Sequence, residues 1–168
     1  MAQATSDAKV EPALKLTFLS HGTLESKDIE ASRRFYEEFL GLDVVRTSEI
    51  SLMIRLGGDN TIAVVKTKHK DTMSVMGHNG LDVATQDDVD EAHRTVLAQQ
   101  EQWGLHDVSA PKLQHGTYSF YFWDADDNCW EILANPPGGY AWLFDVGDRR
   151  GKGHFDRNAL RPGLTLRP

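Results

Sequence analysis

Cysteine is nearly absent from this 168-residue chain, since Cys129 is the only one. No disulfide can therefore form within the chain, and an oxidising compartment loses its main support. The chain also lacks an apolar run long enough to span a membrane, and residues 1–12 lack the apolar core of a signal peptide. The sequence therefore predicts a cytoplasmic protein that does not associate with a membrane.

Positive charge is scarce as well. The 18 Lys and Arg residues are outnumbered by 25 Asp and Glu residues, which gives a formal net charge of -7 and an isoelectric point near 5.4. Nucleic-acid binding depends on concentrated positive charge, so we expect no nucleic-acid partner. Hydrophobic residues make up 40% of the chain, which is enough for the core of one domain or of two small modules that share it.

Two parts of the chain repeat one order of secondary-structure elements. In the first part, apolar periodicity predicts a strand over 14–24, a helix over 28–41 and strands over 43–47, 51–56 and 61–66. In the second part it predicts a strand over 79–84, a helix over 88–102 and strands near Val108, over 118–123 and over 129–133. Segments 59–63 and 127–131 also align with each other. The repeat predicts an α+β fold with two paired βαβββ modules.

Each module alone would leave one face of its sheet uncovered. The modules, at about 14–68 and 76–136, would bury that face by pairing into one curved mixed sheet around a cleft that holds one ligand. Residues 1–13 are expected to form a flexible arm. Residues 137–168 are rich in Gly, Pro and charge, so we expect a solvated, partly ordered extension; closure over the cleft and contact with a partner are the alternatives.

The repeat also points to a metal site. His21 and His78 lie on the first strands of their modules, at equivalent positions, so we expect them to face each other. Glu131 lies on the closing strand of the second module, on the opposite face from Trp130 and Ile132. Two imidazoles and a carboxylate leave open positions on an iron(II) or similar ion, which is typical of catalytic sites. The alternative is a pair of hydrogen-bonded histidines and a solvated glutamate.

Two runs of residues resemble a known family. The run 21–42 resembles the opening of vicinal oxygen chelate domains, and the run 124–131 resembles their closing DPDGN-type turn and ligand glutamate. The resemblance covers about residues 14–136 and implies paired βαβββ modules that bind one metal ion through His21, His78 and Glu131. It also implies a small-molecule substrate with vicinal oxygens and a homo-oligomer, such as a dimer.

The branches of this family differ in their metal ligands and substrate-binding residues, and this chain can be compared with each branch at those positions. The glyoxalase I branch uses a fourth ligand, a glutamate, and Ala63 aligns with that position, so the four-ligand site is missing. Thiol-transferring fosfomycin resistance proteins use three ligands, but their characteristic substrate and potassium-loop residues are not found. The run 115–124 before Glu131 resembles the signature of type I extradiol dioxygenases, with Tyr121 ten residues before the ligand and His115 at its start.

The resemblance therefore implies an iron(II) dioxygenase that inserts both atoms of dioxygen beside the diol of a catechol-like substrate. Fe(II) is the expected metal, with Mn(II) or another divalent ion as the alternative. Tyr121 and His115 are expected to orient substrate; the alternatives are an ordinary strand aromatic and a surface histidine. Asn60 is expected to contact oxygen, although it stands where many extradiol enzymes carry an acid–base histidine and cannot take up a proton.

Two other functions remain open from the sequence. The same metal could act as a Lewis acid in an isomerase, epimerase or lyase of the glyoxalase-like type. A ligand-sequestering protein would keep the cleft and need no metal.

Overall fold

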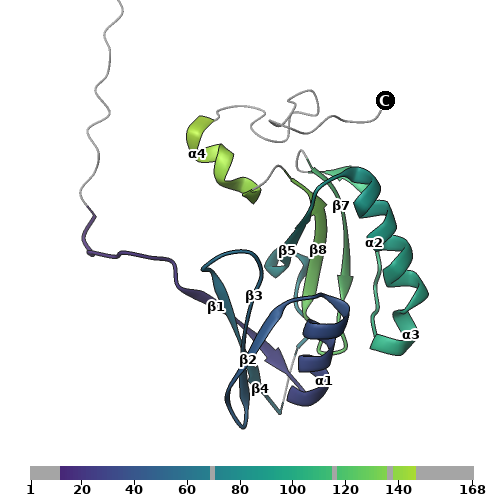
Figure 1. Cartoon of the computed structure of the whole chain (residues 1–168), viewed down its shortest axis with the longest axis horizontal. Coiled ribbons are helices and arrows are strands. Elements are labelled where there is room, and N and C mark those ends of the chain that lie inside the picture. Colours follow the sequence, from purple (N-terminus) through teal and green to yellow (C-terminus); the bar gives the residue numbers. More distant parts are fainter. Residues whose placement is uncertain (1–11, 69–70, 115–116, 136–137, 147–168) are drawn as a thin grey trace, which may run out of the picture.

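The computed structural model describes residues 12–68, 71–114, 117–135 and 138–146, in which eight strands form two four-stranded sheets (Figure 1). The strands of the first sheet are β1 (His21–Ser26), β2 (Asp43–Ser48), β3 (Ser51–Arg55) and β4 (Thr61–Lys66). Those of the second sheet are β5 (Asn79–Val83), β6 (Lys112–Gln114), β7 (Thr117–Trp123) and β8 (Cys129–Ala134). The helical segments are α1 (Ile29–Arg34), η1 (Phe35–Phe39), η2 (Val75–Gly77), α2 (Gln86–Ala98), α3 (Gln100–Trp103), η3 (Gly139–Ala141) and α4 (Trp142–Val146).

Both sheets have the same topology. The first has the order β1-β4-β3-β2 and the second the order β5-β8-β7-β6, and in each the outer strand β1 or β5 is parallel to its neighbour while the other pairs are antiparallel. This confirms the predicted α+β fold of two βαβββ modules. The sheets are separate four-stranded sheets rather than one continuous curved sheet.

The helix boundaries follow from their caps. Asp28 is in an extended conformation, and its carboxylate accepts hydrogen bonds from the backbone N–H groups of Glu30 and Ala31, so it is the N-cap of α1. The second helix begins earlier than predicted, because Thr85 is its cap and Asp88 completes a capping box from the first turn. The first helix does not stay α-helical to Gly41, since η1 is a π-helical turn.

Two strand predictions were wrong. β1 begins at His21 rather than at residue 14, because residues 12–20 have no strand beside them among the described residues. Near Val108 the chain forms only an isolated bridge, between His106 and Trp123, and the sixth strand comes four residues later, at Lys112. Apolar residues alone could not distinguish a strand from extended chain at either place.

The core lies between the sheets and their helices. Alternate residues of the first sheet, such as Leu24 and Val64, and of the second sheet, such as Phe120, join residues of α1, η1 and α2 in one buried apolar cluster. Tyr36 of η1 packs edge-on against Trp130 of β8, with the ring centroids 6.0 Å apart. In Figure 1 α2 lies over one face of the second sheet.

Hydrogen bonds fix the first module against the turn between β7 and β8. The backbone N–H of Lys27 donates to Asp126 Oδ1 at 2.7 Å, and the Asn128 amide donates to the Glu25 carbonyl at 3.0 Å. The Ser32 hydroxyl also donates to Asp126, in a buried contact. Residues 124–131, the run that resembles the closing turn of the family, therefore hold the two modules together and also contain Glu131.

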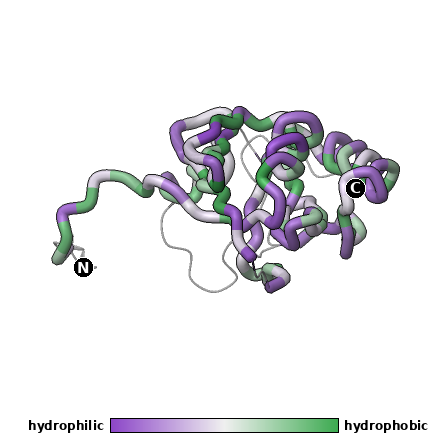
Figure 2. The backbone as a smooth tube through the Cα atoms, turned by 90° about the horizontal axis from the view of Figure 1, so that it is seen from below, coloured by the Kyte–Doolittle hydropathy of each residue, from purple (hydrophilic) through white to green (hydrophobic). Residues whose placement is uncertain are grey.

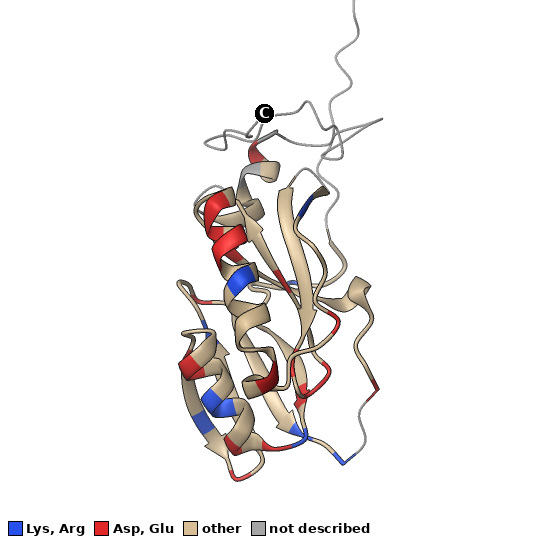
Figure 3. Ribbon diagram, turned by 90° about the vertical axis from the view of Figure 1, so that its right-hand side faces the viewer, with Lys and Arg blue, Asp and Glu red and all other residues tan. Residues whose placement is uncertain are grey.

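One face of the first sheet has little cover. Its side chains include His21 and Thr23, which are exposed, and Met53 and Ala63, which are partly exposed. Residues 12–20, the segment before β1, also have exposed apolar side chains, with Leu16 82% and Leu19 84% exposed. Figure 2 shows this segment extending away from the sheets. Acidic residues gather in the first turns of α2 (Figure 3).

Among the described residues, no helix is both long and apolar enough to cross a bilayer.

Candidate metal centre

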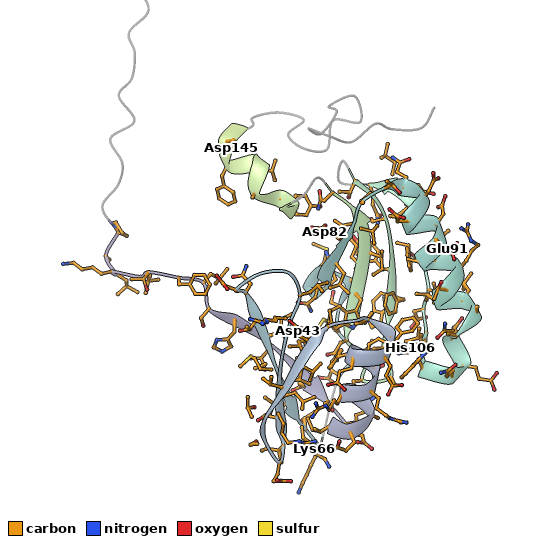
Figure 4. All side chains as sticks on the ribbon, in the orientation of Figure 1. Asp43, Lys66, Asp82, Glu91, His106 and Asp145 are labelled. Atoms are coloured by element: carbon orange, nitrogen blue, oxygen red, sulfur yellow. The ribbon has the colours of Figure 1, made fainter. Side chains whose placement is uncertain are left out.

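Glu131 lies at the middle of the second sheet, on the face turned away from α2. Its side chain is buried, and the register places Tyr121 of β7 on one side of it and Gly80 of β5 on the other. A Cβ at Gly80 would lie 3.3 Å from a methyl carbon of Leu133, so glycine relieves crowding beside the carboxylate. Asp82, labelled in Figure 4, follows on the same face of β5 and accepts a hydrogen bond from Asn135 at 2.8 Å.

His78 turns a ring nitrogen toward this carboxylate. The short helix η2 ends just before it, and His78 Nδ1 donates to the Val75 carbonyl at 2.5 Å. In the neutral ring Nε2 then carries a lone pair, and Nε2 lies 3.2 Å from Glu131 Oε2. Two acceptors at this distance repel each other unless a cation or a proton lies between them. A backbone hydrogen bond on the far ring nitrogen is also the usual arrangement of a metal-binding histidine.

The second carboxylate oxygen of Glu131 has a different partner. The buried Ser119 hydroxyl donates to Glu131 Oε1 at 2.6 Å, and the Gln114 amide donates to the Ser119 oxygen at 2.8 Å. Neither residue was expected from the sequence. The signal was present, because Ser119 alternates with Tyr121 along one face of β7, but the contact to Glu131 is diagonal between strands and needs the register.

Tyr121 belongs to the same cluster. Its ring packs edge-on against the His78 ring, with centroids 5.1 Å apart, while its neighbours Phe120 and Phe122 are buried in the core. Burial raises the pKa of the Tyr121 hydroxyl, and the nearby Glu131 carboxylate raises it further. At neutral pH the phenol therefore keeps its proton and can act as a hydrogen-bond donor.

Cys129 lies on the same strand face and is also buried. Burial, with the Glu131 and Asp124 carboxylates, raises the pKa of its thiol to about 12. The thiolate form is therefore scarce at neutral pH, and a role as nucleophile or metal ligand is disfavoured.

The structure does not bring His21 to this cluster. His21 is exposed on β1, where Nδ1 lies 2.6 Å from the Ser20 hydroxyl. Asn60 is exposed just before β4, and its neighbour Thr61 pairs with His21, so both predicted residues belong to the first sheet. In the described part of the chain, no three His, Cys, Asp or Glu side chains lie close enough to hold one metal ion. His115 lies outside the described residues.

Two further histidines have structural contacts. His93 of α2 packs edge-on against Phe120, at 5.0 Å between ring centroids. The ring nitrogens of His106 lie 2.8 Å from Asp107 Oδ2 and 3.2 Å from Asp127 Oδ1. Neither contact brings a histidine to the cluster of His78, Tyr121 and Glu131.

Comparison with known proteins gives one family and many similar folds. Residues 19–132 match the profile of a family described as the Glyoxalase/Bleomycin resistance protein/Dioxygenase superfamily. A possible glyoxalase from Bacillus cereus is 22% identical, over 70% of this chain and 99% of its own, with a TM-score of 0.58. No curated protein matches the sequence.

Two other solved structures are similar. The fosfomycin resistance protein FosX from Listeria monocytogenes, complexed with Mn(II) and sulfate, is 20% identical, over 73% of this chain and 94% of its own, with a TM-score of 0.58. FosX from Mesorhizobium loti is 24% identical, over 73% and 96%, with a TM-score of 0.55. At these identities the likeness concerns the fold.

Proposed function

Since the chain belongs to the Glyoxalase/Bleomycin resistance protein/Dioxygenase superfamily, we propose that it is an enzyme that binds a divalent metal ion and a small molecule with two neighbouring oxygen atoms. The observation that carries this proposal is the 3.2 Å approach of His78 Nε2 to Glu131 Oε2. Both are metal-type donor atoms, and in the neutral ring whose Nδ1 donates to Val75 the lone pair of Nε2 faces Glu131 Oε2. The donor set therefore fits a divalent cation.

The third ligand of the proposed site is His21 of a second copy of the chain. Within one chain, hydrogen bonds from Lys27 and Asn128 tie the first module to the β7–β8 turn, and closing one sheet over the other would break them. The face of the first sheet that bears His21 is mostly uncovered and partly apolar. The apolar side chains of residues 12–20, just before β1, are exposed as well. These features support a homodimer in which each site combines two ligands from one copy and one from the other.

Each residue of the proposed site then has a distinct role. The metal would supply a Lewis acid for two adjacent substrate oxygens and, if it is iron(II), a redox centre for dioxygen chemistry. Tyr121 keeps its proton and donates a hydrogen bond to a substrate oxygen beside Glu131. Asn60 immediately precedes Thr61, the β4 residue that pairs with His21, and its proposed role is to donate or accept a hydrogen bond at the site without taking up a proton.

The specific reaction that we propose is extradiol ring cleavage of a catechol-like diol by an iron(II) enzyme, with both atoms of dioxygen entering the product. The run 115–124 and the place of Tyr121 support this reaction. His115 is retained as a proposed substrate-orienting residue on the same sequence basis.

A redox-neutral reaction with Mn(II) or another divalent ion is the second candidate. It is favoured by Asn60, which removes the acid–base group that many extradiol enzymes use. The fold is also similar to that of FosX, whose structure contains Mn(II).

Anaerobic purification with iron(II) or Mn(II), followed by a diol panel exposed to oxygen, tests these reactions. Oxygen uptake with yellow ring-opened products supports the dioxygenase. Turnover without oxygen supports the redox-neutral enzyme. A protein that binds neither metal ion overturns the proposed function and leaves a ligand-binding protein.

A further inference from the structure

Four polar side chains form a diagonal row across the second sheet. Gln114 comes from β6, Ser119 from β7 and Glu131 from β8, and His78 immediately precedes β5. The hydrogen bonds have one direction: Gln114 Nε2 donates to Ser119 Oγ, and the Ser119 hydroxyl donates to Glu131 Oε1. Because the row ends on Oε1, the other oxygen, Oε2, is the one that faces His78.

The Ser119 hydroxyl has one proton, and the row fixes where it goes. The Gln114 amide donates to the serine oxygen at 2.8 Å, so the serine proton is directed to Glu131, at 2.6 Å. Ser119 is fully buried, and its charge-assisted hydrogen bond is therefore protected from water. A carboxylate held in this way cannot rotate freely to present both oxygens to one ion.

We propose that Ser119 and Gln114 are positioning residues that hold Glu131 in a one-oxygen binding geometry, with Oε2 toward the metal ion. This inference rests on the metal site proposed above. A carboxylate that offers only Oε2 would leave room beside a bound ion for two substrate oxygens. Residues that orient a ligand in this way affect metal affinity by about 10- to 100-fold when removed.

Mn(II) titration of the metal-free full-length chain tests the proposal, with free Mn(II) measured by electron paramagnetic resonance. Ser119→Ala should weaken Mn(II) binding by about 10- to 100-fold. Gln114→Leu should weaken it in the same direction by a smaller factor, because the serine proton is then no longer directed. Gln114 is partly exposed, so this variant tests the row even if Ser119→Ala fails to fold.

Ser109→Ala is the matched control. Ser109 also places a hydroxyl beside β7, but it accepts from the Tyr121 backbone N–H at 2.9 Å and has no contact with Glu131 in the described structure. This variant should lose stability without a change in Mn(II) affinity. Equal Mn(II) affinities for Ser119→Ala, Gln114→Leu and the wild type would overturn the positioning role. If Glu131→Ala also binds Mn(II) as tightly as the wild type, the proposed metal site fails instead.

Discussion

Asp124 accepts a hydrogen bond from the indole N–H of Trp130 at 2.9 Å, on the strand that carries Glu131 one residue later. The same carboxylate accepts from the backbone N–H groups of Asp126 and Asn128, both at 2.9 Å. Asp124 is 3% exposed, and burial raises the pKa of its carboxyl group to about 6, although these hydrogen bonds act in the opposite direction. The turn that joins the modules therefore contains a carboxyl group whose ionisation lowers the stability of the folded protein.

This effect predicts a pH dependence of stability. Between pH 4 and pH 6 the unfolded chain loses the Asp124 proton while the folded chain retains it, so the contribution of this group to the free energy of unfolding falls as pH rises and is constant above that window. A shift of about two pKa units corresponds to about 3 kcal/mol. Asp124→Asn should be less stable than wild type at pH 4, and this difference should shrink by up to that amount at pH 7.

Urea unfolding at both pH values measures this difference. Asp43→Asn removes an exposed carboxylate of β2 that pairs with Arg55 at 3.2 Å, and it is the control for the loss of one charge: its offset should not shrink from pH 4 to pH 7. An equal offset for Asp124→Asn at the two pH values would contradict the assignment.

Glu131→Gln separates metal binding from folding. The glutamine amide keeps the shape of the side chain, can accept from Ser119 and can donate to His78 Nε2, so the metal-free variant should fold as the metal-free wild type does. The same change should abolish stoichiometric Mn(II) binding. Thermal unfolding with and without Mn(II) tests both statements, and a destabilised variant that still binds Mn(II) would refute them.

Tyr121→Phe should keep the metal and lose activity. The ring still packs against His78, but the hydroxyl that orients substrate oxygen is gone, so kcat/KM should fall by about 100-fold. Steady-state kinetics on whichever substrate the panel identifies provides the measurement, and Mn(II) titration checks that the site is intact. Unchanged kinetics would return Tyr121 to a packing role.

Asn60→His distinguishes the two reaction classes. In an extradiol enzyme the new imidazole can accept and return a proton, so turnover should rise or gain a pH limb near about 6.5. In a redox-neutral enzyme native activity should fall or stay level and no ring cleavage should appear. Oxygen uptake across pH on both proteins decides between them, and a variant that binds iron but consumes no oxygen with any diol argues against the dioxygenase.

Periodicity and the internal repeat predicted both modules. Alternation along β7 and β8 also predicts which strand face carries Tyr121 and which carries Glu131, and the register shows that the two side chains are neighbours on one face. The same patterns could not predict the contacts of Ser119 and Gln114 with Glu131. These contacts depend on how β6, β7 and β8 align with one another, which the sequence of each strand alone does not determine. Equivalence in the repeat is visible in the structure, where His21 begins β1 and His78 immediately precedes the matching strand β5, but it carries no information about which module faces which. That depends on the contacts of Lys27 and Asn128.

Two differently tagged variants, His21→Ala and Glu131→Ala, test the site between copies most directly. Each alone should bind no Mn(II) tightly, because every site lacks one of three ligands. In a purified mixed dimer, one site combines both substitutions and the other contains none, so about one tight Mn(II) per dimer should return. Mixed dimers without a tight Mn(II) site, or either single variant with full Mn(II) content, would contradict a metal centre shared by two chains.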